Sequence, residues 1–179
     1  MTEALVIVDF QNDFCPGGAL AVPAGDEIGP RVADLAGSGR FDLVIATRDW
    51  HPPDHGSFAE QGGPWPPHCV ADSPGAQLNE AVPRDRVDVV LDKGTDPLTE
   101  GYSGFEGTGL AELLRDRGID RVTLVGLATD YCVRATALDA LDAGFGVTVD
   151  REGVRGIDAQ PGDADRALEE IAAAGGTVA

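Results

Sequence analysis

The stretch RVTLVGLATDYCVRATALDALDAGFGVTVD, residues 121–150, contains a complete strand–helix–strand pattern. Residues 121–126 and 145–150 are short apolar runs with many β-branched side chains, which is typical of buried strands. Between them, residues 130–143 are rich in Ala, Leu and acidic side chains and end before Gly144, as a helix does. This order predicts two parallel strands that are joined by a helical crossover.

The same alternation continues on both sides of this unit. Three further apolar runs predict strands, at residues 4–10, 43–49 and 87–93, and three further segments predict helices, at residues 26–37, 108–117 and 163–174. We therefore expect one α/β domain over residues 1–179, with three layers and a central, mainly parallel sheet. Residues 50–84 interrupt the pattern with seven prolines and no periodicity, and so long a loop in a compact domain usually carries function.

The charge and the cysteines of the chain restrict its partners and its compartment. Thirteen Lys and Arg against 31 Asp and Glu give a net charge of −18, so we expect neither nucleic acid nor an anionic membrane as partner. The start of the chain, MTEALVIVDFQND, has no basic segment and no long apolar run, which predicts a cytoplasmic protein. The three cysteines are too few and too far apart for a disulfide framework, so we expect reduced thiols. Whether the protein forms a homo-oligomer stays open.

Polar side chains stand at the carboxyl ends of four predicted strands, where ligands bind in open parallel sheets. Asp9, Asp49 and Lys93 close three of them, and RVTLVG leads through LATDY to Cys132 near the start of a helix. Lys93 is also the only lysine of the chain. Because the N–H groups at a helix start stabilise an anion, we expect a lowered pKa for the Cys132 thiol. The alternatives are solvated residues at strand ends and an ordinary buried cysteine.

All three histidines lie in the long loop. Asp49 and His51 are two positions apart, a spacing that turns both side chains to one face of a strand, and the double proline after His51 forces His55 to return through a turn. His68 follows the segment WPP. One carboxylate and up to three imidazoles suit one divalent transition metal ion, for which we expect zinc, with iron and manganese as alternatives. The competing interpretation is that the histidines only form hydrogen bonds within the loop.

Five segments carry a resemblance to a known family. They are VDFQNDFCPGGAL at 8–20, ATRDWHPPDHGSF at 46–58, WPPHCV at 65–70, DKGTDPLTEGYSGFEG at 92–107 and GLATDYCVRATALDAL at 126–141. With them the chain resembles the metal-containing nicotinamidases of the isochorismatase-like cysteine hydrolase superfamily. The motif DFQNDF marks only the superfamily, whereas the second and third segments are much more specific.

The resemblance implies a catalytic triad, a metal site, an oxyanion hole and an aromatic pocket. The triad is Asp9, Lys93 and Cys132. The metal ligands are Asp49, His51, His68 and, as in some members, His55. A cis peptide before Ala128 aims the backbone N–H groups of Ala128 and Cys132 into the oxyanion hole. Phe14 and Trp65 match the aromatic walls of the substrate pocket.

The implied reaction is the hydrolysis of nicotinamide to nicotinate and ammonia through a thioester on Cys132, as a step of NAD salvage, with pyrazinamide as an analogue. Asp9 acts as the base, Lys93 holds Asp9 and the thiolate, and the metal binds the pyridine nitrogen. Two alternatives remain. One is a related cysteine amidohydrolase for another carbamoyl or acyl-amide substrate, which needs no histidine cluster. The other is a catalytically silent binding module with the same fold.

Overall fold

The computed structural model describes residues 1–179, and its centre is a sheet of six parallel strands in the order β3-β2-β1-β4-β5-β6. The strands are β1 (Glu3–Val8), β2 (Leu43–Asp49), β3 (Val89–Lys93), β4 (Arg121–Leu127), β5 (Gly146–Arg155) and β6 (Thr177–Val178). Every pair of neighbouring strands is parallel. The prediction of a central parallel sheet is confirmed.

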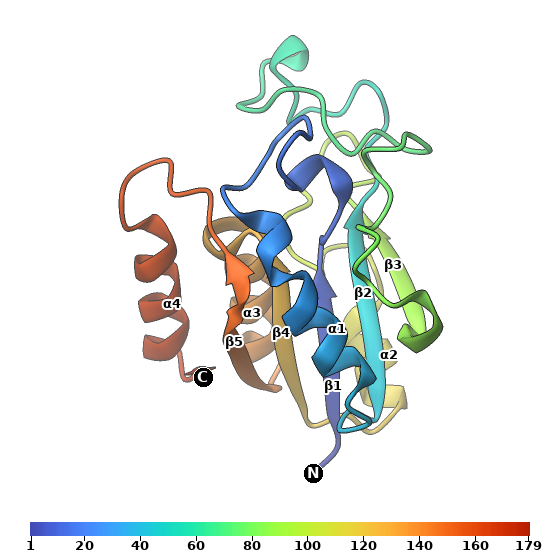
Figure 1. Ribbon diagram of the computed structural model, residues 1–179, viewed down its shortest axis with the longest axis vertical. Helices are drawn as coiled ribbons and strands as arrows, with labels where there is room; N and C mark the ends of the chain where they lie inside the picture. The colour runs from blue at the N-terminus through green and yellow to red at the C-terminus, as the bar shows by residue number, and fades with distance from the viewer.

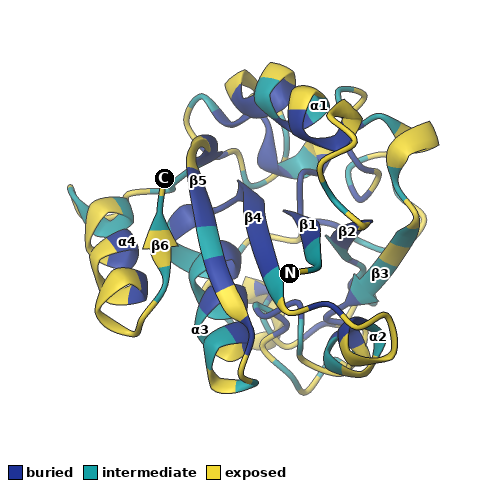
Figure 2. Ribbon diagram, turned by 90° about the horizontal axis from the view of Figure 1, so that it is seen from below, coloured by how far each residue is buried: buried dark blue, intermediate teal, exposed yellow.

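Helices cover both faces of this sheet. They are α1 (Gly29–Gly37), α2 (Leu110–Asp116), α3 (Arg134–Asp142) and α4 (Asp163–Ala173). In Figure 1, α1 lies in front of the sheet, and α2 and α3 lie behind it; Figure 2 shows the buried strands between these helices. Successive residues of β1 belong to different cores, because Val6 packs with α2, α3 and α4 whereas Leu5 and Ile7 pack with α1. The protein therefore has the expected three α/β/α layers.

The structure adds two features at the far side of the sheet. β5 continues through residues 151–155, three of which are charged, and the two-residue edge strand β6 lies beside it. Neither this extension of β5 nor β6 has the apolar run that predicts a strand.

The predicted helix 130–143 is divided into a π-helical turn, Thr129–Val133, and α3. Cys132 lies in that turn, and π-helical turns are frequent at functional sites.

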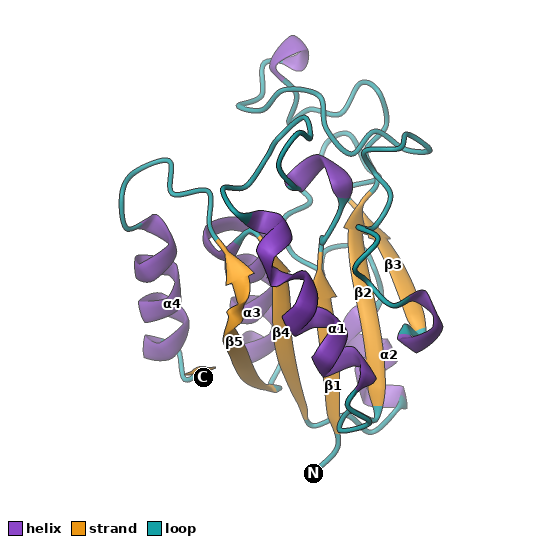
Figure 3. Ribbon diagram, viewed as in Figure 1, coloured by secondary structure: helices purple, strands orange, loops and turns teal.

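Long loops gather at the carboxyl ends of the strands, at the top of the molecule in Figure 3. An isolated bridge between Gln11 and Leu78 ties the loop 50–84 to the rest of the chain, and a bridge between His51 and Val70 joins two parts of the loop itself. Only short 3-10 turns interrupt it. None of the helices has the length and apolar character needed to cross a membrane.

Candidate active site

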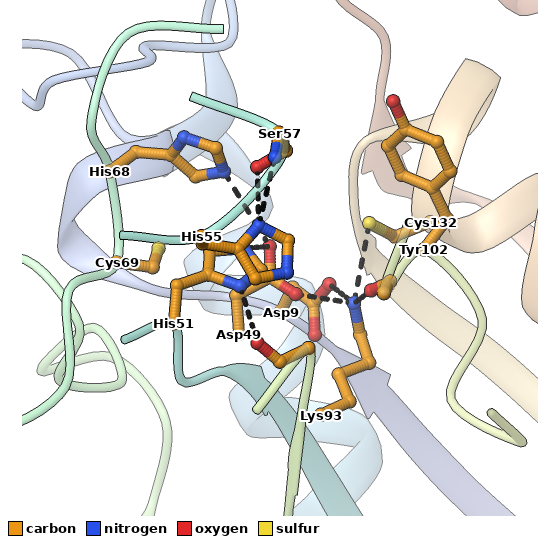
Figure 4. Close-up of polar contacts among 12 residues, drawn as sticks. Asp9, Asp49, His51, His55, Ser57, His68, Cys69, Lys93, Tyr102 and Cys132 are labelled. Atoms are coloured by element: carbon orange, nitrogen blue, oxygen red, sulfur yellow. Dashed lines mark hydrogen bonds and ion pairs between the residues drawn. The ribbon is translucent and has the colours of Figure 1, made fainter. Parts of the chain in front are cut away.

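The three predicted catalytic residues meet at the carboxyl ends of β1, β3 and β4. The Lys93 ammonium Nζ lies 2.7 Å from Asp9 Oδ2 and 3.5 Å from Cys132 Sγ (Figure 4). All three residues are buried, with exposed fractions of 0% for Asp9, 1% for Lys93 and 5% for Cys132. The sheet thus brings a carboxylate, an ammonium and a thiol into one water-poor cluster.

Thr47 holds the Asp9 carboxylate in place. Its hydroxyl donates a 2.8 Å hydrogen bond to Asp9 Oδ1, and its carbonyl accepts a 3.1 Å bond from the Asp9 backbone N–H. Asp9 has a left-handed backbone with φ of 46°, which directs the chain out of β1 and is unusual for a residue other than glycine. Thr47 has no distinguishing signal in the sequence, because a threonine in a buried strand is a common β-former.

Lys93 also contacts the predicted metal site. Its Nζ donates hydrogen bonds to Asp49 Oδ1 at 2.6 Å and to the Gly101 carbonyl at 2.5 Å. One ammonium is therefore shared by Asp9 and Asp49, the carboxylates of two sites that the sequence analysis treats separately. Without Lys93, two buried carboxylates would face each other with no positive charge between them.

Burial and charge set the protonation states of the cluster. Burial raises the pKa of Asp9 to about 6, although Lys93 opposes the shift. Burial favours the neutral form of Lys93, but Asp49 and Asp9 outweigh it and raise the pKa of the ammonium well above its usual range. Burial also raises the pKa of the Cys132 thiol, so the expectation of a lowered value is wrong. Near pH 7 the cluster holds an ionised Asp9, a cationic Lys93 and a neutral thiol.

Three of the four predicted metal ligands converge beside this cluster. The ligand atoms of Asp49, His51 and His68 all lie within 4.8 Å of one another, and all three residues are buried. Asp49 Oδ2 is 3.3 Å from His51 Nε2 and 3.9 Å from His68 Nε2. Burial opposes the ionisation of Asp49, yet Lys93 and His51 outweigh it and lower the pKa of the carboxyl. This carboxylate therefore has one oxygen toward the ammonium and the other toward the imidazoles.

Backbone carbonyls fix the tautomers of two histidines. His51 Nδ1 lies 2.8 Å from the Gly94 carbonyl, and His68 Nδ1 lies 2.8 Å from the Pro66 carbonyl. Because a carbonyl only accepts, each Nδ1 carries the proton, and in the neutral ring the Nε2 lone pair faces Asp49. Two such lone pairs and a carboxylate oxygen around one point form a donor set for one cation. A divalent metal ion with nitrogen and oxygen ligands fits this donor set.

A glycine allows the close approach at His51. Gly94 has a φ of 61°, and a Cβ at this position would collide with the imidazole ring of His51. Only a residue without a side chain can therefore place its carbonyl against Nδ1 here.

His55 lies outside the three-residue cluster. Its ring packs against the His51 ring with centroids 4.0 Å apart. His55 Nδ1 lies 2.7 Å from the Ser57 hydroxyl and 3.2 Å from the Ser57 backbone N–H, and its buried Nε2 has no hydrogen-bond partner. Burial, followed by the charge of His51, lowers the pKa of His55 to about 4, which keeps the ring neutral near pH 7.

The thiol and the metal cluster open into the same pocket, which is open to solvent on one side. Phe14 and Trp65, the two predicted wall residues, line it, as does Ala128. Four further apolar or aromatic wall residues were missed by the sequence analysis: Leu20, Tyr102, Tyr131 and Ile157. Asp9 and Lys93 are absent from the lining and lie behind it. The peptide bond between Leu127 and Ala128 is cis, as the resemblance implied.

Aromatic contacts organise one side of this pocket. The indole N–H of Trp65 donates a 3.0 Å hydrogen bond to the Tyr102 hydroxyl. The ring of Tyr131 stands nearly perpendicular to that of Trp65, at 82° with centroids 5.1 Å apart. The loop 50–84, the β3–α2 connection and the π-helical turn are therefore held together around the pocket.

Two polar residues of the motif DFQNDF support the metal cluster from outside. The Gln11 side chain accepts the Asp49 N–H and donates to the Asp49 carbonyl, both at 2.8 Å. The Asp13 carboxylate accepts the N–H of Cys69, next to His68, at 2.8 Å. As a sequence pattern, the motif marks only the superfamily. Its polar side chains position two of the predicted ligands.

A comparison with protein families identifies the chain. The model of the isochorismatase domain matches residues 3–179. The chain belongs to the isochorismatase family. Among its relatives in this family, the nicotinamidase of Escherichia coli is 45% identical over 200 residues, which cover 98% of this chain and 93% of the relative.

Solved structures of similar proteins include two with ligands. The crystal structure of the pyrazinamidase of Pyrococcus horikoshii in complex with zinc has a TM-score of 0.92 and 51% identity, and the match covers 100% of this chain and 99% of that chain. The structure of PnC1 from L. infantum in complex with nicotinate has a TM-score of 0.94 and 37% identity, with 99% and 92% covered. The isochorismatase-family fold of this chain is thus shared along its whole length.

Proposed function

We propose that this protein hydrolyses nicotinamide to nicotinate and ammonia. The observation that carries the proposal is that the Cys132 thiol and the cluster of Asp49, His51 and His68 open into one pocket. A triad alone suffices to cleave an amide, so the adjoining cluster must serve another purpose, and orienting a ring nitrogen is such a purpose. The names of the relatives support this substrate.

Cys132 is the nucleophile. Because its thiol is neutral near pH 7, it needs a base, and Asp9, with a pKa of about 6, is ionised and close enough to take the proton. The sulfur attacks the amide carbon, and Asp9 passes the proton to the departing ammonia. A water molecule then hydrolyses the thioester and releases nicotinate. Lys93 stays protonated and stabilises the charge of the resting Asp9 carboxylate and the negative charge that forms on the sulfur when Asp9 takes the proton.

The backbone N–H groups of Ala128 and Cys132 form the oxyanion hole. Each such donor stabilises the transition state by about 3 kcal/mol in comparable acyl-transfer enzymes. Ala128 and Cys132 line the same pocket, which supports this role.

Asp49, His51 and His68 hold one divalent metal ion, for which zinc is the first candidate and iron or manganese the alternatives. When bound, the ion supplies an electron-pair acceptor for the pyridine nitrogen. Phe14 and Trp65 pack against the ring. His55, which the sequence analysis also named as a ligand, supports the site by stacking on His51. We place the enzyme in the cytoplasm and in NAD salvage, with pyrazinamide as a second substrate.

Ammonia release from matched amides tests this function. The zinc-loaded enzyme should release ammonia rapidly from nicotinamide, and benzamide should be a much poorer substrate because it lacks the ring nitrogen. Equal rates for the two amides would show that the metal does not bind the ring nitrogen of the substrate. Release from other carbamoyl or acyl amides but not from nicotinamide would favour the related amidohydrolase instead.

A further inference from the structure

Asp49 has a cation position on each side of its carboxylate. On one side, Oδ2 faces the Nε2 atoms of His51 and His68. On the other side, Oδ1 accepts a hydrogen bond from Lys93 Nζ at 2.6 Å. A carboxylate that bridges two cations in this way is the usual bridging ligand of two-metal sites.

The second position has a metal-ligand set of its own. One ligand atom each of Asp9, Asp49 and Cys132 lies within 4.8 Å of the other two, and all three residues are buried. Two carboxylates and a thiol are ligands that zinc accepts, and a thiolate is the ligand type that soft metal ions prefer. Asp49 and Cys132 also line the pocket, which provides a route of entry.

Lys93 occupies this second position. Its Nζ lies 2.7 Å from Asp9 Oδ2, 2.6 Å from Asp49 Oδ1 and 3.5 Å from Cys132 Sγ. Asp9 Oδ2 has no hydrogen-bond partner, so the ion pair with the ammonium compensates this buried oxygen. The centre therefore has the arrangement of a two-metal site in which an ammonium stands in place of the second ion (Figure 4).

We propose that Lys93 excludes divalent metal ions from the thiol, and that its removal opens a second metal site formed by Asp9, Asp49 and Cys132. A metal at this site would displace the thiol proton into solvent and form a metal–sulfur bond, which would consume the nucleophile. Exclusion is needed here because the protein holds a metal site one carboxylate away. The inference rests on the proposed function for that neighbouring metal and for Cys132 as nucleophile, but its test measures bound metal and not turnover.

The experiment compares wild-type protein with Lys93→Ala after equilibration with excess zinc or cadmium and removal of free ion. Wild type should retain about one equivalent and Lys93→Ala about two, as expected for a single-metal and a two-metal site. Cadmium in Lys93→Ala should also produce an ultraviolet thiolate-to-metal charge-transfer band. The band should be absent from wild type and from the double variant Lys93→Ala/Cys132→Ser.

Arg134→Ala is the matched control for the loss of one positive charge. Arg134 pairs with Glu170 at the surface, at 2.6 Å, and lies outside the cluster. This variant should bind no extra metal. If Lys93→Ala gains neither an equivalent nor the thiolate band, the inference is wrong. A wild type with no metal would instead refute the neighbouring site of the proposed function, while a thiol-bound equivalent in Lys93→Ala would still support the inference.

Lys93→Asn guards against misfolding, because its short amide leaves the ammonium position open while keeping a hydrogen-bond donor. It should bind the second equivalent as Lys93→Ala does. If both variants are unfolded without metal, circular dichroism should show that cadmium restores the fold. Failure of cadmium to restore it would count against the second site as clearly as a missing equivalent.

Discussion

Thr47→Val should raise the pH at which the enzyme becomes active. The substitution keeps the shape of the side chain and removes the 2.8 Å hydrogen bond from the Thr47 hydroxyl to Asp9 Oδ1. That bond stabilises the ionised carboxylate, so its loss favours the protonated form, which cannot act as a base. Turnover should therefore need a higher pH than in wild type.

The size of the shift follows from the strength of the bond. A hydrogen bond to a charged group contributes about 1.5–3 kcal/mol, and about 1.4 kcal/mol corresponds to one pKa unit. In the wild type, the midpoint of the acid limb of the pH profile of kcat/KM should lie near pH 6, because the pKa of Asp9 is about 6. In Thr47→Val it should lie about one to two units higher. At pH 7 the ionised fraction of Asp9 would then fall from roughly nine-tenths to between about one half and one tenth.

The assay is ammonia release from nicotinamide between pH 5 and 9, about the range that brackets both expected limbs. Thr123→Val is the matched control, because the buried Thr123 on β4 donates a 2.6 Å hydrogen bond to Glu3 at the start of β1. Thr123→Val should lower the free energy of unfolding by an amount similar to Thr47→Val, and it should leave the acid limb of the pH profile unchanged. An unchanged limb in Thr47→Val, or equal shifts in both variants, would refute Asp9 as the base.

Three further predictions concern the thiol, the metal ligands and the surface. Cys132→Ala should abolish turnover and keep nicotinamide binding measurable by calorimetry, whereas Cys15→Ala and Cys69→Ala should stay active; turnover by Cys132→Ala would end the cysteine mechanism. His51→Ala should lose bound zinc by elemental analysis because it removes a ligand, and His55→Ala should retain most of it; the reverse order would make His55 a ligand. With a net charge of −18, the melting temperature should rise between millimolar and molar KCl as repulsion is screened, and a flat curve would show that the acidic surface is simply well solvated.

The sequence by itself determined the fold class and most of the residues at the site. Alternating apolar runs and helical segments predict parallel strands, and parallel strands end at the same edge of a sheet. Asp9, Asp49 and Lys93 therefore had to lie at the same edge of the sheet, whatever the strand order. The metal cluster could also be predicted from the sequence, because Asp49 and His51 lie at the end of the same strand. Local periodicity is sufficient for conclusions of this kind.

Only the tertiary structure decided how these groups act on one another. The shared ammonium depends on β2 lying between β1 and β3, and that neighbour relation has no local signal. The same holds for Thr47, whose hydroxyl reaches Asp9 from the adjacent strand, and for His55, whose ring stacks on His51 beside the cluster of Asp49, His51 and His68. The thiol pKa was predicted wrongly because a helix start can be recognised in the sequence, whereas complete burial cannot. Burial, distance and hydrogen-bond direction arise only when distant segments pack, and in a buried cluster they outweigh the local effects.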